Sequence, residues 1–387
     1  MQRDQENCSH SMDRHPDEAQ GEQRKRPPSV WLLVDDRPGN ATQGIGLVSL
    51  LNWPYELKTL RFNVLSRLPN PLLGRSRLSL DQRHSTPLVP PWPDLVVAAG
   101  RRLAPIARWI KMRSGNRTKV IQIGRKGGSD TRGLDLVISC GHYRLPDDAR
   151  RLEIFMPLTR VTRERLVEAA EDWAGGFGTL VRPHVALLVG GPTPVHRFDE
   201  EIARRLAEDV GAAVKKAGGS LTVTTSRRTP STVVDAMRAA LAPEVAFFVW
   251  KPNQRRNPYL ALLAVADILV VTGESESMLA EAVEAAKPLY IYALPERRLG
   301  WARRAKEAVV DLAYTPGGGF IGGIGRRLIR HGWMWPKRDF SRLHQNLIDA
   351  GLARPFGDLH QFAPSSRQTD RQEIVRRVHA LWLDALP

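Results

Sequence analysis

The chain has 387 residues, of which 42% are hydrophobic and 25% charged, so it is a globular protein too long for one ordinary core. The sequence contains no stretch of about 18 apolar residues, which is the length needed to cross a membrane. The only cysteines are Cys8 and Cys140, which excludes a disulfide framework and favours a reducing compartment. No Cys/His group has the spacing of a zinc site, so we expect no metal. The polar residues 1–28 lack the apolar core of an export signal, and we expect a disordered leader on a cytoplasmic protein.

The charge is strongly positive, with a formal net charge of +16 and a pI near 10.4. Residues 297–342 hold eleven Arg or Lys against three Asp or Glu, interleaved with Trp301, Trp333 and Trp335. This composition favours an anionic membrane face or a phosphorylated ligand, and we expect no nucleic acid because no nucleic-acid motif accompanies it. Two alternatives stay open: the tryptophans belong to a core beneath a solvated face, or the genome simply enriches arginine.

Strand and helix signals alternate along the first half of the chain. We expect strands at 30–35, 55–62, 95–99, 119–123 and 134–140, with a further strand or a crossover at 153–158. A turn at 36–40 precedes a helix at 42–51, and helices are also expected near 102–113 and at 161–173. The long connection 67–93, rich in Pro, Ser and Arg, suits a functional or mobile loop.

The alternation restarts after the glycine-rich segment 174–178. We expect strands at 185–189, 221–225, 245–250, 268–272 and 289–294. Helices are expected at 197–217, 231–241, 257–266, 275–286, 299–312, 341–350 and 372–383. Two such blocks predict an α/β protein with two doubly wound parallel-sheet (Rossmann-like) domains, facing across a cleft at the carboxyl ends of the strands. The predicted boundaries are 29–175 and 176–340, with helices of 341–387 packing at the seam.

The central stretch, 268–294, indicates a buried strand, a tight loop, a helix and a second strand. The free N–H groups at such a helix start suit an anion. Glu281 lies about two helical turns after Gly273, which is a suitable place for a ribose. An ordinary βαβ unit whose Ser and Glu residues only cap and solvate it is the alternative.

Four loops at the predicted carboxyl edge of the second sheet carry glycines, hydroxyls and cations suited to a diphosphate. Glu274 and Glu276 add negative charge, which Arg227, Arg228 or Lys251 would have to offset. The predicted donor-site residues are Gly190, Gly191, Thr225, Ser226, Arg227, Arg228, Lys251, Asn253, Thr272, Gly273, Ser275, Ser277, Met278 and Glu281.

In the first half, Asp35 ends a strand and could act as a general base, or could instead cap the next helix or pair with Arg37. His142, after the strand ending at Cys140, is a second acid/base candidate and could equally be a hydrogen-bonded loop histidine. The predicted acceptor-side residues are Arg37, Gly39, Asn40, Gln43, Gly44, Arg101 and Arg102. The chain lacks a P-loop, a complete dinucleotide fingerprint, a GxSxG elbow and an HExxH motif.

Six segments carry a family resemblance: VDDRPGNATQGIGL (34–47), PDLVVAAGRRLAPIAR (93–108), VALLVGGPTPVHRFD (185–199), TVTTSRRTP (222–230), VTGESESMLAEA (271–282) and GLARPF (351–356). Together they resemble the bacterial and plant proteins related to the plant mitochondrial-fission (elongated-mitochondria) protein, over roughly residues 29–356. The resemblance implies a GT-B fold, with a nucleotide-sugar donor in the C-terminal domain. It implies donor contacts at Gly191, Thr225, Ser226, Ser277 and Glu281, with Glu281 in the ribose-binding position.

The leading hypothesis is a metal-independent glycosyltransferase without a cofactor. It would move a sugar from a nucleoside-diphosphate sugar to a lipid-linked or cell-envelope acceptor at the inner face of the membrane. Two alternatives stay open, a non-catalytic adaptor of the same fold on a membrane surface and a nucleotide-sugar epimerase. The sequence does not specify the sugar, the base, the acceptor, the stereochemistry or the oligomeric state.

Overall fold

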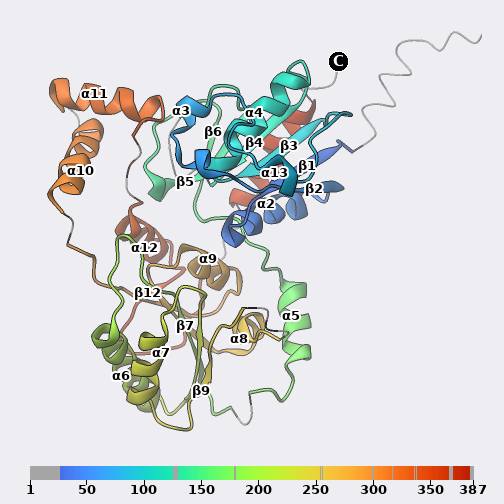
Figure 1. Cartoon of the computed structure of the whole chain (residues 1–387). Helices are drawn as coiled ribbons and strands as arrows, with labels where there is room; N and C mark the ends of the chain where they lie inside the picture. Colours follow the sequence, from blue (N-terminus) through green and yellow to red (C-terminus); the bar gives the residue numbers. More distant parts are fainter. Residues whose placement is uncertain are drawn as a thin grey trace, which may run out of the picture.

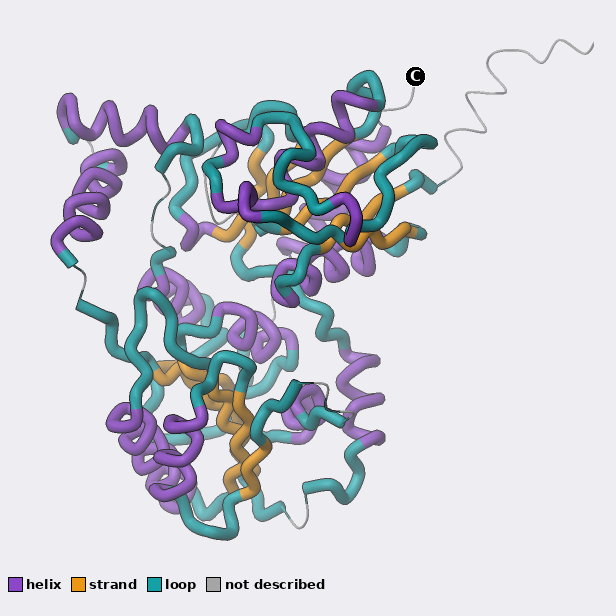
Figure 2. The backbone as a smooth tube through the Cα atoms, in the orientation of Figure 1, coloured by secondary structure: helices purple, strands orange, loops and turns teal. Residues whose placement is uncertain are grey.

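The computed structural model describes residues 27–124, 130–177, 180–252, 254, 256–298, 300–315, 317–334, 336, 338–365 and 369–383. The predictions for residues 1–26, Asn253 and Trp335 lie outside the described residues. The chain forms two halves, each built around a six-stranded parallel sheet with helices on both faces (Figures 1 and 2). The predicted fold class, two doubly wound parallel sheets in the GT-B manner, is confirmed.

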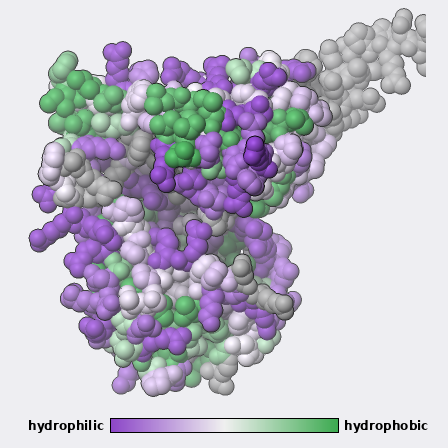
Figure 3. Space-filling model, in the orientation of Figure 1, coloured by the Kyte–Doolittle hydropathy of each residue, from purple (hydrophilic) through white to green (hydrophobic). Residues whose placement is uncertain are grey.

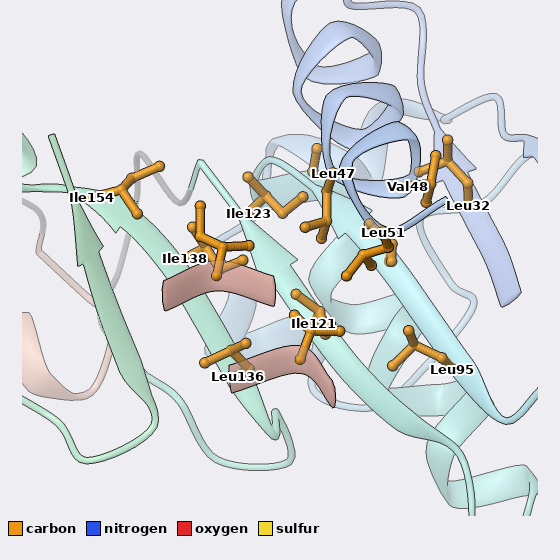
Figure 4. Close-up of a cluster of buried hydrophobic side chains, with 14 of the residues drawn as sticks. Leu32, Leu47, Val48, Leu51, Leu95, Ile121, Ile123, Leu136, Ile138 and Ile154 are labelled. Carbon is orange, nitrogen blue, oxygen red and sulfur yellow. The ribbon is translucent and has the colours of Figure 1, made fainter. Parts of the chain in front are cut away.

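The first sheet has the order β2-β1-β3-β4-β5-β6. Its strands are β1 (Val30–Val34), β2 (Tyr55–Thr59), β3 (Leu95–Ala99), β4 (Lys119–Ile123), β5 (Leu136–Cys140) and β6 (Arg151–Ile154). Alternate strand residues point to opposite faces. One face therefore packs on α2 (Pro38–Leu51) and α13 (Thr369–Leu383), and the other on α4 (Ala104–Arg113). Figure 4 shows Leu47, Val48 and Leu51 of α2 beside sheet residues such as Leu32 and Ile121.

The second sheet has the order β12-β11-β10-β7-β8-β9. Its strands are β7 (His184–Val189), β8 (Ser220–Thr225), β9 (Ala246–Phe248), β10 (Ile268–Thr272), β11 (Leu289–Tyr292) and β12 (Arg354–Pro355). One face is covered by α6 (Glu200–Lys216) and α7 (Ser231–Ala240). The other is covered by α8 (Tyr259–Val265), α9 (Glu276–Glu284) and α12 (Phe340–Asp349).

Three remaining helices lie outside these layers: α5 (Arg163–Asp172), α10 (Trp301–Tyr314) and α11 (Gly319–Arg330). α10 and α11 form a hairpin that projects from the side of the molecule (Figure 1). The loop 60–94 carries the short helix α3 (Asn70–Leu73). In the described part of the chain, no helix is long and apolar enough to cross a bilayer.

Two sequence predictions need correction. The sixth strand spans Arg151–Ile154, whereas we expected a strand or a crossover at 153–158. α2 begins at Pro38, inside the predicted turn 36–40, because proline at the first helical position has a suitable φ and needs no N–H partner. The glycine-rich segment 317–325 forms most of α11, whose glycines allow close packing on α10.

Candidate functional site at the facing helix starts

Each sheet has one topological switch point. There, successive strands stop being added on one side of the first strand and are added on its other side. In the first sheet it lies between β1 and β3, and in the second between β7 and β10. Asp35 follows β1 and Gly100 follows β3, whereas Gly190 follows β7 and Gly273 follows β10. Ligands of open α/β sheets bind at the carboxyl ends of the strands at such points. Both switch points carry residues that the sequence predicted for the site.

The second switch point is held together by Glu274 and the two glycines after β7. Gly190 N–H donates to Thr272 Oγ1 (2.8 Å), and Gly191 N–H donates to Glu274 Oε1 (2.7 Å). A Cβ on Gly190 would lie 1.8 Å from Glu274 Oε1, so a larger residue is excluded here. Burial raises the pKa of Glu274 to about 7, although Arg228 and the neighbouring N–H groups favour its charged form. At neutral pH, Glu274 therefore carries only part of the negative charge expected from the sequence.

The loop after β8 packs directly on the glycines. Arg228 Nη1 donates to Gly191 O (3.1 Å), and Arg228 Nη2 lies 3.7 Å from Glu274 Oε1. Thr229 Oγ1 donates to Gly190 O and accepts from Ser226 N–H (3.0 Å). The predicted loops of β7, β8 and β10 are therefore one connected structure, and Arg228 is the cation beside Glu274.

The start of α9 faces the start of α2 across the cleft between the sheets. A Cβ placed on Gly39 would lie 3.9 Å from Ser277 Oγ, so the two first turns are in near contact. Neither helix has a side-chain cap bond among the described residues, and α2 has no acidic residue in its first turn. The N–H groups of two first turns are thus directed toward one place. Such a position favours an anion.

Asp35 lies beside this place and is buried. Its carboxylate accepts from Arg37 N–H (3.2 Å) and from Asn40 Nδ2 (3.3 Å). Burial raises the pKa of Asp35, and the bonds from Arg37 and Asn40 partly offset that rise. A raised pKa makes the carboxylate a stronger base, while the Asn40 amide fixes its orientation.

His142 lies under the other end of the cleft in a closed cluster. Its Nε2 is 3.2 Å from Glu276 Oε1, and its side chain has no exposed surface. Glu276 also accepts from the Tyr143 hydroxyl and from Arg338 Nη1 (2.9 Å). Phe340 of α12 covers the imidazole, with ring centroids 6.5 Å apart. In this arrangement the His142 side chain is closed off from solvent, and Glu276, in the first turn of α9, shares its charge with Arg338.

Among the residues that the structure describes, one group has the geometry of metal ligands. The ligand atoms of Cys140, His142 and Glu276 lie within 4.8 Å of one another, and all three residues are buried. Glu276, however, already interacts with Tyr143 and Arg338. A cation would have to compete with that guanidinium, so the cluster is best described as an ion-paired network between the halves. The expectation of no metal stays a prediction.

Glu281 lies on α9 and is bonded to the neighbouring helix α8. It accepts from the Tyr259 hydroxyl (2.7 Å), and burial raises its pKa. The positive charge of Arg165 on α5 partly offsets that rise. A ribose at this position would have to share Glu281 with Tyr259, so the ribose role stays a prediction.

Several predicted acceptor-side residues have structural partners. Arg101 holds the loop before α3, donating to Leu68 O (2.6 Å), Ser66 O and Asn70 Oδ1 (3.2 Å). Arg102 pairs with Asp36 at 3.0 Å. Gln43 and Gly44 are buried residues of α2 itself, with Gln43 beside Gly124 and Gly44 against Leu32. Only Arg37, Gly39 and Asn40 remain next to the facing helix starts.

Some of the other predicted donor residues contact partners inside the protein, and others are exposed. Met278 packs in the core beneath α9. Gly273 O accepts from His344 Nε2 of α12 at 2.7 Å, which requires the imidazole tautomer with its proton on Nε2. Thr225 Oγ1 accepts from Trp250 N–H (2.9 Å). Ser275 is the uncapped residue before α9, whereas Arg227, Lys251 and Ser277 are exposed.

A cavity of about 450 Å³ lies between the halves, but it is not built from these residues. It is lined by α2 at Ile45 and Ser49, by the connection 154–162, and by α13 at Asp370 and Ile374. The cavity therefore lies beside the segment 154–162, which connects the two sheets. Neither Asp35 nor Gly190 lines it. This cavity was not predictable from the sequence, because its walls are distant segments without a shared motif.

Residues that the sequence analysis missed are those that act through partners far along the chain. Arg338 neutralises Glu276 and Tyr143 donates to it. Asn40, by contrast, was predicted, but its close packing on Gly100 was not. A Cβ on Gly100 would lie 2.4 Å from Asn40 Nδ2. The basic segment 297–342 was a general signal for charge, but the pairing of Arg338 with Glu276 had no local signature.

Comparison with known proteins now identifies the family. A profile described as "Mitochondrial fission ELM1" matches residues 38–314. The chain belongs to this family. It is 26% identical to the uncharacterized protein RP120 of Rickettsia prowazekii over 300 residues, which are 69% of this chain and 84% of that protein. It is 28% identical to mitochondrial fission protein ELM1 of Arabidopsis thaliana over 221 residues, 51% of each chain.

Among solved structures, the ELM1-family chain is similar to a glycosyltransferase from Rickettsia africae. The TM-score is 0.44 at 11% identity, covering 93% of this chain and 99% of that one. A UDP-GlcNAc 2-epimerase from Methanocaldococcus jannaschii has a TM-score of 0.46 at 10% identity, covering 91% and 99%.

Proposed function

We propose that this ELM1-family protein is a glycosyltransferase whose donor is a nucleoside-diphosphate sugar. The observation that carries the proposal is the near contact of Gly39 and Ser277, which brings the uncapped starts of α2 and α9 together between two switch points. A diphosphate matches this place in charge. The first-turn N–H groups would stabilise the charge that develops on the leaving diphosphate.

Asp35 is the proposed general base. Its carboxylate would take the proton of an acceptor hydroxyl as that oxygen bonds to the anomeric carbon and the diphosphate leaves. Arg228, beside Gly191, would neutralise the departing charge. The acceptor proposed is a lipid-linked or cell-envelope glycan approached from the first half, on a protein peripheral to the inner membrane face. No metal or cofactor takes part in the proposed reaction.

A thermal-shift screen with uridine, guanosine, cytidine and thymidine diphosphates and their sugars tests the donor site. A ligand at about 100 times its dissociation constant should stabilise the protein by roughly 2.7 kcal/mol. Ser277→Glu adds a carboxylate beside the facing helix starts and should remove the shift. Ser231→Glu, at the exposed start of α7, is the matched control and should keep it.

Turnover is tested separately with Asp35→Asn, which should bind the donor as wild type does and lose donor hydrolysis or transfer. The proposal fails if no diphosphate shifts the unfolding temperature, or if Ser277→Glu and Ser231→Glu behave alike. The epimerase alternative is weakened by the enclosure of His142, since its chemistry needs several acid/base groups in the cleft.

A second candidate, a non-catalytic adaptor, is favoured by the same enclosure of His142 together with the binding of Arg101 and Arg102 within the first half. An adaptor would leave the donor unhydrolysed with every acceptor fraction tried. Donor binding without turnover in both wild type and Asp35→Asn would support it.

A further inference from the structure

Exposed apolar side chains gather on two elements that belong to different halves of the molecule. One group surrounds α3: Val64, Leu65, Leu68, Leu72 and Leu78 are all exposed, Val64 by 69%. The second group lies on α11, where Phe320 is 84% exposed and Ile321 and Ile324 are also exposed. We call these the α3 patch and the α11 patch. Figure 3 shows hydrophobic side chains over both elements on the same face of the molecule.

The exposure of the α11 patch follows from the way α11 packs on α10. The contact face is made of Gly322, Gly325 and Ile329, which are buried. A Cβ on Gly322 would lie 2.5 Å from Leu312 O, so only glycine allows this approach. The helix thus uses its small residues for folding and leaves its large apolar residues in solvent. A stable fold gains nothing from that arrangement unless the large residues have another contact.

The charge around both patches is positive. The segment 61–80 has four arginines and no acidic residue, and the segment 317–338 likewise has no acidic residue. Arg67 and Arg75 are exposed beside the α3 patch, and Arg327 and Arg330 beside the α11 patch. Apolar side chains among arginines are typical of surfaces that enter the headgroup region of an anionic bilayer.

A basic recess at the foot of α11 strengthens this match. A cavity of about 590 Å³ is lined by Arg144, Arg326, Arg330 and Arg342. Arg151, Asp147 and Glu153 also line it, and Arg151 pairs with Asp147 at 2.9 Å. Arg144 pairs with Asp311 at 3.0 Å, and this pair fixes the α10–α11 hairpin to the first half. The recess has an excess of arginine, so it suits the phosphate of a lipid headgroup.

We infer that the α3 patch and the α11 patch together dock the protein on an anionic lipid bilayer. The two patches enter the same leaflet, with the arginines at headgroup level. The inference rests on the peripheral membrane location proposed above and names the surface responsible for it, and it is tested apart from sugar transfer because docking requires no donor and no catalysis. It would place the cleft beside the membrane, where a lipid-linked acceptor lies.

Co-sedimentation of the full-length protein with vesicles tests the inference. The vesicles are phosphatidylcholine with or without phosphatidylglycerol. Wild type should bind only the vesicles with phosphatidylglycerol, and binding should fall at high salt. Phe320→Ser/Ile324→Ser and Leu72→Ser/Leu78→Ser should each weaken partitioning roughly tenfold or more, since each removes two inserted apolar side chains. Val167→Ser, an exposed valine on α5, should bind as wild type does.

Circular dichroism and unfolding temperature confirm that the variants are folded. The inference is overturned if the wild-type protein does not bind vesicles with phosphatidylglycerol, or if both double variants bind them as well as Val167→Ser does. It is also overturned if sedimentation without vesicles shows a dimer that Phe320→Ser/Ile324→Ser dissociates, because the α11 patch is then a contact between copies. Donor binding is measured without vesicles, so failure here is distinguishable from failure of the glycosyltransferase proposal.

Discussion

Tyr143 and Glu276, 133 residues apart in the chain, share a hydrogen bond that joins the loop after β5 to the first turn of α9. Both side chains are buried, and Glu276 also faces His142 and Arg338. The two halves therefore meet through a network of charged and polar groups as well as through apolar contacts. Each member depends on the others, because a buried carboxylate without its donors is costly.

Tyr143→Phe should lower the free energy of unfolding by about 1–3 kcal/mol, because Glu276 loses a buried donor. Tyr55→Phe, on an exposed tyrosine of β2, is the matched control and should change little. Urea denaturation measures both. Equal stabilities would show that the hydrogen bond contributes nothing to holding the halves together.

Glu274 should make stability depend on pH. Its folded pKa of about 7 lies above its ordinary value of 4.5, so the folded state binds the proton more tightly. The stabilisation from this group is fully present below about pH 4.5 and is lost as the pH rises through about 7. Glu274→Gln, which can keep the acceptor for Gly191 N–H, should remove this part of the dependence. Denaturation curves at pH 5 and about pH 8 test it, and parallel losses in both proteins would contradict it.

Gly191→Ala should destabilise the second half by about 1–3 kcal/mol, because the added Cβ would lie 2.3 Å from Arg228 O. The neighbouring atom is backbone and cannot rotate away. Gly357→Ala adds the same group where nothing lies within 4 Å, and its effect should be within about 0.5 kcal/mol. Thermal unfolding of the two variants gives the comparison, and a Gly191→Ala protein as stable as Gly357→Ala would refute the close packing.

Arg101→Lys should loosen the loop before α3 while keeping the positive charge. A lysine lacks the planar fork that donates to Leu68 O, Ser66 O and Asn70 Oδ1. Amide hydrogen exchange in residues 64–73 should become faster, whereas Arg67→Lys, at an exposed position, should leave it unchanged. If exchange is unaltered and acceptor affinity alone falls, Arg101 binds substrate as the sequence first suggested.

The sheets could be predicted because their strands are continuous apolar runs, as at Val185–Val189, which parallel sheets bury on both faces. The place of Asp35 was also predictable, since it follows the first strand of a doubly wound sheet. α11 was not predictable, because isolated glycines weaken helices and only the contact with α10 explains them here.

The candidate site was predictable only as a set of loops. The grouping of Gly190, Glu274 and Arg228 follows from strand order, which the alternating pattern implies. The pairing of His142 with Glu276 depends instead on how two sheets sit against each other, and no local pattern encodes that. The partners of Arg101 were not predictable for a related reason, since they lie in a loop without periodicity.

α13, at the end of the chain, completes the core of the first sheet, where Ile374 and Val378 pack beside α2. The polypeptide therefore crosses between the halves twice, once before α5 and once after β12. A premature stop near residue 360 would leave the second sheet whole and expose apolar residues of the first. The half made earliest on the ribosome is thus completed only once residues 369–383 have been synthesised, and separate expression of residues 29–175 would leave apolar residues of its core exposed.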